Sequence, residues 1–198
     1  LGLELCGCGA PVRDCEFWNA VLRSAFGGFD ADQALEHAEN EEYLITRRRG
    51  ARLRFPSRLA PALRPAFAAF ADQRLRLFRA VAEVSGASLI VDSSKVPRYG
   101  LAIAAIDGLD VRAVDLVRDC RAVAYSWRTV KESPRADGTV TEMPRYTPEV
   151  TATRWLTRAF QMEGGWAFAG RRMRLHYEAF VAAPEGHTRR LLRFVDHP

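Results

Sequence analysis

Lysine is almost missing from this sequence, because only Lys95 and Lys131 occur among its 29 basic residues. Arginine therefore supplies nearly all of the positive charge as a planar fork of donors, whereas a lysine supplies a compact point charge. Lys95 stands in the stretch LIVDSSKVPRYG, residues 89–100, directly after a short apolar run and shortly before a proline. Lys95 is therefore a first candidate for a functional side chain.

A long apolar run is also missing, since the longest pieces, such as LAIAAI, fall well short of the roughly 18 residues of a membrane-spanning helix. We therefore expect a soluble, cytoplasmic protein with no membrane span. Its 198 residues, 48% of them hydrophobic and 10% aromatic, suit a single globular domain with a real core. The net charge of +5 favours anionic ligands such as phosphates, sulfates or nucleic acid, without selecting one of them.

Cysteine is scarce, and three of the four cysteines crowd into CGCGAPVRDC, residues 6–15. Cys6, Cys8 and Cys15 could begin a zinc site, but structural zinc takes four ligands and no fourth one stands nearby in the sequence. Reduced thiols in a tight glycine-rich turn are the favoured interpretation, and we expect no metal cofactor. The zinc alternative stays open at this stage.

The apolar pattern alternates between helices and strands along most of the chain. Three-and-four spacing predicts helices at residues 15–28, 65–84, 99–108, 120–132, 149–170 and after Pro184. Short apolar runs predict strands at residues 88–94, 111–119 and 172–177. Strands separated by helices predict an α/β fold, in which a parallel sheet carries helices on both faces.

The remaining segments are charged or rich in turn residues. Residues 30–42 are acidic and residues 47–64 are rich in arginine, a contrast that is typical of solvated loops or surface. Residues 133–148 contain proline and glycine and are predicted to form a loop, which we expect to border an acceptor pocket.

Polar side chains gather where the predicted strands end. Asp92 to Lys95 fall at the carboxyl end of the first strand, Arg118 at that of the second, and Tyr177 at that of the third. Since ligands of open α/β sheets bind at the carboxyl ends of the strands, these residues indicate one site. Arg118 and Ser126 are eight residues apart, about two helical turns, so both can face one crevice. A guanidinium and a hydroxyl suit a dianionic phosphate, and the alternative is an Arg118 that satisfies a helix end or pairs with Asp119.

Three segments carry a family resemblance: VDSSKVP, DLVRDCRAVAYSW and LHYEAF. They resemble the sulfotransferases that use 3′-phosphoadenosine 5′-phosphosulfate (PAPS), and CGCGAPVRDCEFW looks like a segment of bacterial members. The resemblance implies a three-layer α/β fold of the P-loop nucleotide-hydrolase type. It implies transfer of a sulfuryl group from PAPS to a hydroxyl or amine of an acceptor. It also implies that Arg118 and Ser126 bind the 3′-phosphate, that Tyr177 lies close to the nucleotide, and that Lys95 is catalytic.

Sulfuryl transfer would give Lys95 a definite physical role. The SO3 unit moves in line from a phosphate to the acceptor, and negative charge builds on the bridging oxygen of the departing nucleotide. A cation at that oxygen stabilises the transition state more than the ground state. Lys95 could neutralise this oxygen or donate a proton to it, and a structural lysine paired with Asp92 is the alternative.

The sequence departs from the family pattern at its start. Family members open with a strand and a loop resembling Gly-x-x-Arg-Ser-Gly-[Ser/Thr]-Thr that holds the 5′-phosphosulfate, and no such loop occurs in these 198 residues. We therefore expect a chain truncated at its N-terminus, and we leave a cut at its C-terminus open. Without those donors at the transferring group, this chain by itself is expected to be feeble or inactive.

Two other functions remain open from the sequence. A small-molecule kinase would also use a phosphate-binding parallel sheet, but it needs a Walker-type Gly-Lys-Ser/Thr loop and an acid for magnesium. A non-catalytic nucleic-acid-binding module could use the arginines between Arg47 and Arg64, but only Phe55 lies among them as a stacking residue. We therefore expect a nucleotide donor and a hydroxyl- or amine-bearing acceptor as partners, and no nucleic acid.

Overall fold

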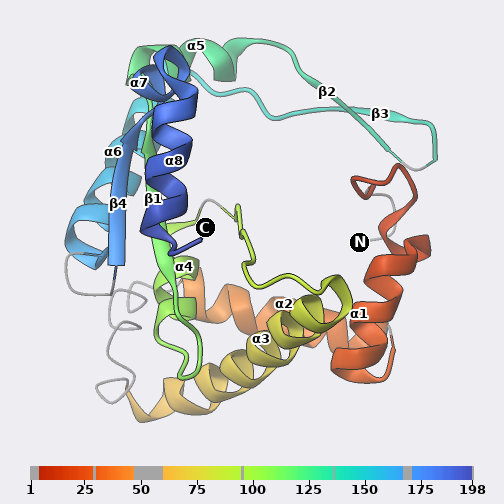
Figure 1. Ribbon diagram of the computed structural model, residues 1–198. Helices are drawn as coiled ribbons and strands as arrows, with labels where there is room; N and C mark the ends of the chain where they lie inside the picture. The colour runs from red at the N-terminus through yellow and green to blue at the C-terminus, as the bar shows by residue number, and fades with distance from the viewer. Residues whose placement is uncertain are drawn as a thin grey trace.

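A computed structural model describes residues 5–28, 30–46, 60–94, 96–135, 137–166 and 171–197. Its helices are α1 (Glu16–Phe26), α2 (Ala31–Thr46), α3 (Arg64–Ser85), α4 (Pro97–Ala104), α5 (Cys120–Arg128), α6 (Pro148–Trp166), α7 (Tyr177–Ala182) and α8 (Pro184–Phe194), with short 3-10 helices η1 (Val12–Asp14) and η4 (Pro61–Leu63). Its strands are β1 (Arg112–Val117), β2 (Glu132–Pro134), β3 (Val140–Glu142) and β4 (Arg171–His176). Figure 1 shows α1, α2 and α3 together on one side, and α5 to α8 gathered around β1 and β4 on the other.

The parallel pair β1–β4 confirms the strands predicted at residues 111–119 and 172–177. Arg112 lies opposite Arg171 at one end of the pair, and Val117 lies opposite His176 at the other. The crossover between the strands contains α5 and α6, as parallel pairing requires a long connection that is usually helical. The fold is therefore α/β, with a small parallel sheet among many helices.

A second sheet, the antiparallel hairpin of β2 and β3, forms part of the segment predicted as a loop at residues 133–148. β2 pairs with β3, with Glu132 opposite Glu142. Its turn carries Gly138 at a φ of +78°, a conformation that glycine adopts without the strain of a Cβ. Helix α5 ends at Arg128, and the chain becomes extended at Thr129 before it enters β2 at Glu132. The helix is therefore shorter than the predicted range 120–132.

The strand predicted at residues 88–94 is wrong, because this segment pairs with no strand of the described ranges. Leu89, Ile90 and Val91 are 39%, 37% and 84% exposed, although the pattern predicted a buried strand. An apolar run forms a strand only where a neighbour takes up its N–H and C=O groups and another layer covers it. Within the described residues the parallel sheet contains β1 and β4 only, so a three-layer sheet stays a prediction.

The acidic segment 30–42, expected to form a solvated loop or surface, lies largely in helix α2. Asp30 begins this helix, because its Oδ1 accepts hydrogen bonds from the N–H groups of Asp32 and Gln33 at 2.9 and 3.0 Å. Most of α2 is exposed, as expected for a charged surface, while Leu44 is buried. Residues 47–59 of the arginine-rich segment lie outside the described residues.

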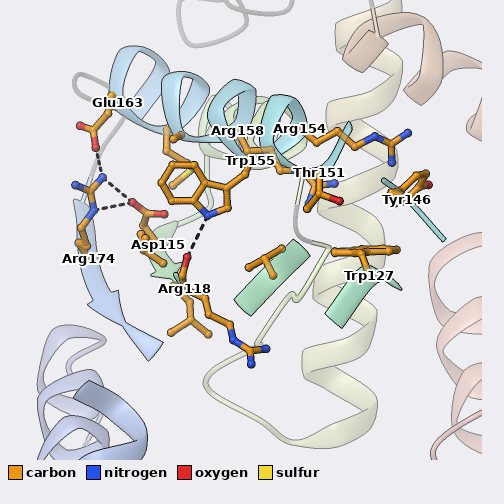
Figure 2. Close-up of a pocket in the computed structure, with 15 residues that line it drawn as sticks. Asp115, Arg118, Trp127, Tyr146, Thr151, Arg154, Trp155, Arg158, Glu163 and Arg174 are labelled. Atoms are coloured by element: carbon orange, nitrogen blue, oxygen red, sulfur yellow. Dashed lines mark hydrogen bonds and ion pairs between the residues drawn. The ribbon is translucent and has the colours of Figure 1, made fainter. Parts of the chain in front are cut away.

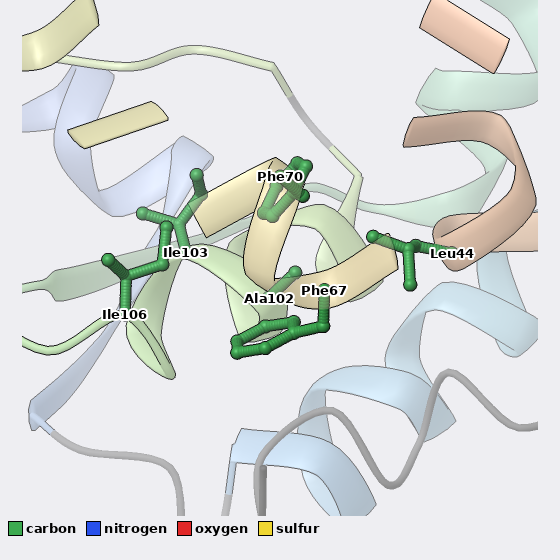
Figure 3. Packing of buried hydrophobic residues seen from close by; sticks show 6 residues of the cluster. All are labelled: Leu44, Phe67, Phe70, Ala102, Ile103 and Ile106. Atoms are coloured by element: carbon green, nitrogen blue, oxygen red, sulfur yellow. The ribbon is translucent and has the colours of Figure 1, made fainter. Parts of the chain in front are cut away.

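Helices α2, α3 and α4 share one apolar core (Figure 3). Its buried members are Leu44 of α2, Phe67 and Phe70 of α3, Ala102 and Ile103 of α4, and Ile106 just after α4. The long helix predicted at residues 65–84 supplies the two aromatic rings and ends at Ser85, followed by Gly86 as a C-cap with a φ of +66°. This core holds α4 against α3.

Helix α4 crosses α6 at two glycines. The pair Gly164–Gly165 does not break α6, which runs through to Trp166. A Cβ at Gly165 would lie 2.6 Å from Leu101 Cδ1, and a Cβ at Gly100 would lie 2.8 Å from a ring carbon of Trp166. These two glycines therefore allow the close approach of the two helices.

Gly100→Ala is expected to lower the free energy of unfolding by about 1–3 kcal/mol, because the buried ring of Trp166 would have to move. Gly164→Ala is the matched control, since among the described residues no atom outside the adjoining turns of α6 lies within 4 Å of the added Cβ. The control is expected to leave the free energy of unfolding unchanged or to raise it by up to about 1 kcal/mol. Urea denaturation measures both variants, and equal destabilisation by the two would contradict the close contact.

Helix α5 begins at a side-chain cap formed by Asp119. Asp119 Oδ1 accepts from the N–H group of Arg121 at 2.8 Å, and Oδ2 accepts from the Arg121 guanidinium at 2.7 Å. The bonds from the Arg121 side chain, followed by the one from its backbone, lower the pKa of Asp119 to about 2. The ion pair of Asp119 is therefore made with Arg121, which leaves Arg118 available for another role.

The Asp119 cap is expected to make α5 sensitive to acid. Because the folded pKa lies below the ordinary value of 3.8, the charge stabilises the fold above that value and stops doing so as the pH falls towards 2. Asp119→Asn keeps a capping oxygen but removes the charge. The difference in melting temperature between the two proteins, followed by circular dichroism, is expected to shrink from about pH 5 to about pH 2. A constant difference would show that the charge contributes nothing.

Candidate active site

The carboxyl ends of β1 and β4 lie side by side and bring Arg118 and Tyr177 together. Val117 and His176 are the last paired residues, so Arg118 and Tyr177 are the next residues on neighbouring strands. The guanidinium carbon of Arg118 lies 4.7 Å from the centroid of the Tyr177 ring, a cation–π contact. Two residues that the sequence placed at the ends of separate strands therefore meet in one place.

The backbone of Arg118 is anchored, whereas its side chain keeps an unused donor. The carbonyl oxygen of Arg118 accepts a hydrogen bond from Trp155 Nε1 at 3.1 Å, which ties the end of β1 to α6 (Figure 2). Among the described residues, Arg118 Nε is buried and has no hydrogen-bond partner. A buried unpaired donor costs about 1–3 kcal/mol, so an anionic acceptor that reached this group would stabilise it.

Ser126 lies on α5 and pairs with a residue to which the sequence assigned no role. Its Oγ accepts a hydrogen bond from Lys131 Nζ at 2.9 Å. The scarcity of lysine was the one signal that could have pointed to Lys131. Arg118 lies two residues before the start of α5, and Ser126 lies near its end. In the described part of the chain no hydrogen bond or ion pair joins the two side chains.

Glu178 also takes part in the site and was missed. Its Oε1 accepts a hydrogen bond from the backbone N–H group of Asp119 at 3.0 Å, which joins the residues that follow β4 to those that follow β1. This bond is the largest of the causes that lower the pKa of Glu178, so the carboxylate is held in its charged form. An open depression at these strand ends is lined by Val117, Arg118, Asp119, Cys120, Arg121, Trp155, His176 and Glu178.

A more enclosed cavity of about 430 Å³ lies between β1, α5 and α6 (Figure 2). Its wall combines aromatic rings with guanidinium groups: Trp127, Tyr146 and Trp155, and Arg118, Arg154, Arg158 and Arg174. The guanidinium carbon of Arg154 lies 3.9 Å from the centroid of the Tyr146 ring, and the Tyr146 and Trp127 centroids are 5.0 Å apart. The volume and the partly apolar wall are typical of small-molecule sites. Arg118 lines both this cavity and the depression.

One side of the cavity is held by a cluster of two acids and two arginines. Asp115 of β1, only 11% exposed, accepts from Arg172 at 3.2 Å and from Arg174 at 2.9 Å. Glu163 of α6 accepts from the same two arginines, and the bond from Arg174 is the first cause that lowers its pKa. These ion pairs join β1, β4 and α6, and they neutralise Arg174 at the cavity wall.

Lys95, the predicted catalytic residue, lies outside the described residues. Its neighbour Asp92 is exposed, and Asp92 Oδ1 accepts from the N–H group of Ser94 at 2.8 Å and from the Ser94 hydroxyl. This side-chain turn occupies the place where the sequence predicted the end of a strand. The pairing of Lys95 with Asp92, weighed above as an alternative, stays untested.

The chain has one clear relationship to known proteins. Neither the curated proteins nor the solved structures include a match to it. Of the helices in the described ranges, none has the length and apolar character that a bilayer crossing requires. A family model described as "Sulfotransferase family" matches residues 17–198. Since this match covers far more than half of the sequence and includes every strand described above, the chain belongs to the sulfotransferase family.

Proposed function

We propose that the protein transfers the sulfuryl group of PAPS to a hydroxyl or amine of an acceptor. The observation that carries this proposal is the contact between Arg118 and Tyr177 at the ends of β1 and β4. It places a guanidinium with an unpaired N–H group at the edge of the sheet where open α/β sheets bind ligands. The match to the sulfotransferase family supports the type of reaction.

Arg118 and Ser126 are proposed to bind the 3′-phosphate of the nucleotide, with Lys131 as an additional cation. The Ser126 hydroxyl already accepts from Lys131, so its own proton is free to be donated to a phosphate oxygen. The Tyr177 ring holds the Arg118 guanidinium and borders the nucleotide. Charge-assisted bonds from an arginine and a lysine suit a dianionic phosphate better than a neutral hydroxyl.

Lys95 is proposed as the catalytic cation at the bridging oxygen of the departing nucleotide. Charge develops on this oxygen during transfer, and a lysine there stabilises the transition state. Lys95 stands two residues before Pro97, the first residue of α4, whose position is set by the core with α3. The proposal includes the three-layer P-loop-like fold, of which β1 and β4 would be two strands.

The acceptor is proposed to bind in the cavity between β1, α5 and α6. Tyr146, from the segment expected to border an acceptor pocket, lines this cavity, and Arg154 stacks on its ring. Arg118 lines both the cavity and the depression at the strand ends, so the proposed nucleotide and acceptor sites adjoin at this residue. Arg154 and Arg158 of the wall, unlike the neutralised Arg174, favour acceptors that carry an anionic group.

The proposal predicts that the chain binds adenosine 3′,5′-bisphosphate more tightly than adenosine 5′-monophosphate in calorimetric titrations. Arg118→Ala is expected to weaken bisphosphate binding by about 10-fold to 100-fold, because a charge-assisted bond is lost, and to leave the monophosphate unaffected. Arg76→Ala is the control, since Arg76 is an exposed arginine of α3 paired with Asp72. Equal affinity of the wild-type chain for both nucleotides would contradict the 3′-phosphate site, and ATP binding that requires magnesium would favour a kinase.

Lys131→Ala is expected to weaken binding of the bisphosphate by about threefold to fivefold, as an exposed charge contributes less than a buried one. The salt dependence of binding should also decrease, because one cation fewer acts on the phosphate. Arg145→Ala provides the control. Arg145 is an exposed cation near the same hairpin, and it pairs with Glu142 at 3.9 Å. Titrations at two salt concentrations measure both effects, and unchanged affinity in Lys131→Ala would remove Lys131 from the site.

A further inference from the structure

Three cysteine sulfurs lie together at the N-terminal turn, outside the residues that match the sulfotransferase family. Cys15 Sγ lies 3.5 Å from Cys6 Sγ and 3.7 Å from Cys8 Sγ, and all three sulfurs lie within 4.8 Å of one another. Cys15 is buried, Cys6 is partly buried, and Cys8 is exposed. The cluster therefore packs against the protein through Cys15, and solvent can reach it from the side of Cys8.

The backbone of the turn brings these sulfurs together. Leu5 and Pro11 form an antiparallel bridge, and inside it the N–H group of Cys6 donates to the carbonyl of Ala10 at 2.8 Å. The N–H group of Gly9 donates to the carbonyl of Cys6 at 2.9 Å, and Gly9 has a φ of +87°, which favours glycine. The chain then passes through η1 and returns Cys15 to the turn at the start of α1.

The separations between the sulfurs fit a shared metal ion. With zinc–sulfur bonds of about 2.3 Å, two thiolates on a tetrahedral zinc ion lie about 3.8 Å apart. A disulfide requires a distance of about 2.05 Å and joins only two sulfurs, which leaves the third unexplained. Two separations of 3.5 and 3.7 Å that share Cys15 resemble two edges of a tetrahedron.

We propose that Cys6, Cys8 and Cys15 bind one Zn²⁺ ion as thiolates, with water in the fourth position. Each thiol releases its proton to solvent when its sulfur binds the metal. Thiolates select a soft ion such as zinc over magnesium or calcium. Among the described residues no fourth histidine, cysteine or carboxylate joins the cluster, and the exposure of Cys8 lets water reach the fourth position. The sequence alone favoured free thiols, because it did not show that Cys15 returns to the other two.

The metal would connect the N-terminal turn to the helices. Cys15 is the residue before α1, and α1 packs along α3. A zinc ion bound to all three sulfurs would therefore hold residues 6–10 against this helical layer. Removal of the ion is expected to lower the melting temperature, since metal binding stabilises the folded state that contains the site.

The test measures metal content and metal spectra and does not depend on nucleotide binding. The whole chain is purified under reducing conditions, and its metal content is measured by elemental mass spectrometry. We expect one zinc ion per molecule. Replacement by Co²⁺ should give thiolate-to-cobalt absorption and the visible bands of a tetrahedral site. Cys8→Ser, which changes an exposed ligand and so preserves the core, should weaken zinc binding by about tenfold or more. Cys120→Ser, at the exposed fourth cysteine, should leave zinc binding unchanged.

Several results would overturn the proposal. Folded, reduced protein that binds neither zinc nor cobalt would do so, as would a Cys8→Ser variant that binds zinc as tightly as the wild type. A disulfide between two of these cysteines in freshly purified protein that takes up no zinc would assign them to redox chemistry. Stoichiometric iron with the absorption of an iron–sulfur cluster would assign them to a different cofactor.

Discussion

The parallel pairing of β1 with β4 depends on carboxylates that neutralise its arginines. Arg112 and Arg171 lie opposite each other, where like charges repel, and Asp196 pairs with both at 2.8 and 3.2 Å. Further along the pair, Asp115 binds the two arginines of β4 that also bind Glu163. The candidate site follows from this pairing, because the paired strands present their carboxyl ends side by side.

The strand ends divide the basic residues into two kinds. Arg172 and Arg174 are bound by acids and hold the sheet to α6. Arg118 instead lies over the Tyr177 ring with one buried donor unused, and Lys131 is paired with a hydroxyl. Within the described residues neither Arg118 nor Lys131 forms an ion pair, so both keep an attraction for an anionic ligand, whereas neutralised cations serve mainly to stabilise the fold. This difference supports a phosphate site near Arg118 more strongly than the net charge of the chain does.

Close helix packing links the site to the rest of the molecule. Gly100 and Gly165 allow α4 to approach α6, and Trp155 of α6 holds the carbonyl of Arg118. The core shared by α2, α3 and α4 stabilises the same arrangement from the other side.

The sequence by itself determined the elements whose pattern is local: α1, α3, α5, β1 and β4, and the placement of Arg118 and Tyr177 at strand ends. Their apolar periodicity and the common edge of parallel strands are enough for that. Only the tertiary structure decided that residues 88–94 form no strand, that Lys131 reaches Ser126, and that Cys15 returns to Cys6 and Cys8. Each of these depends on which segments become neighbours, and a neighbour supplies the hydrogen bonds or the ligand atoms that no single segment contains.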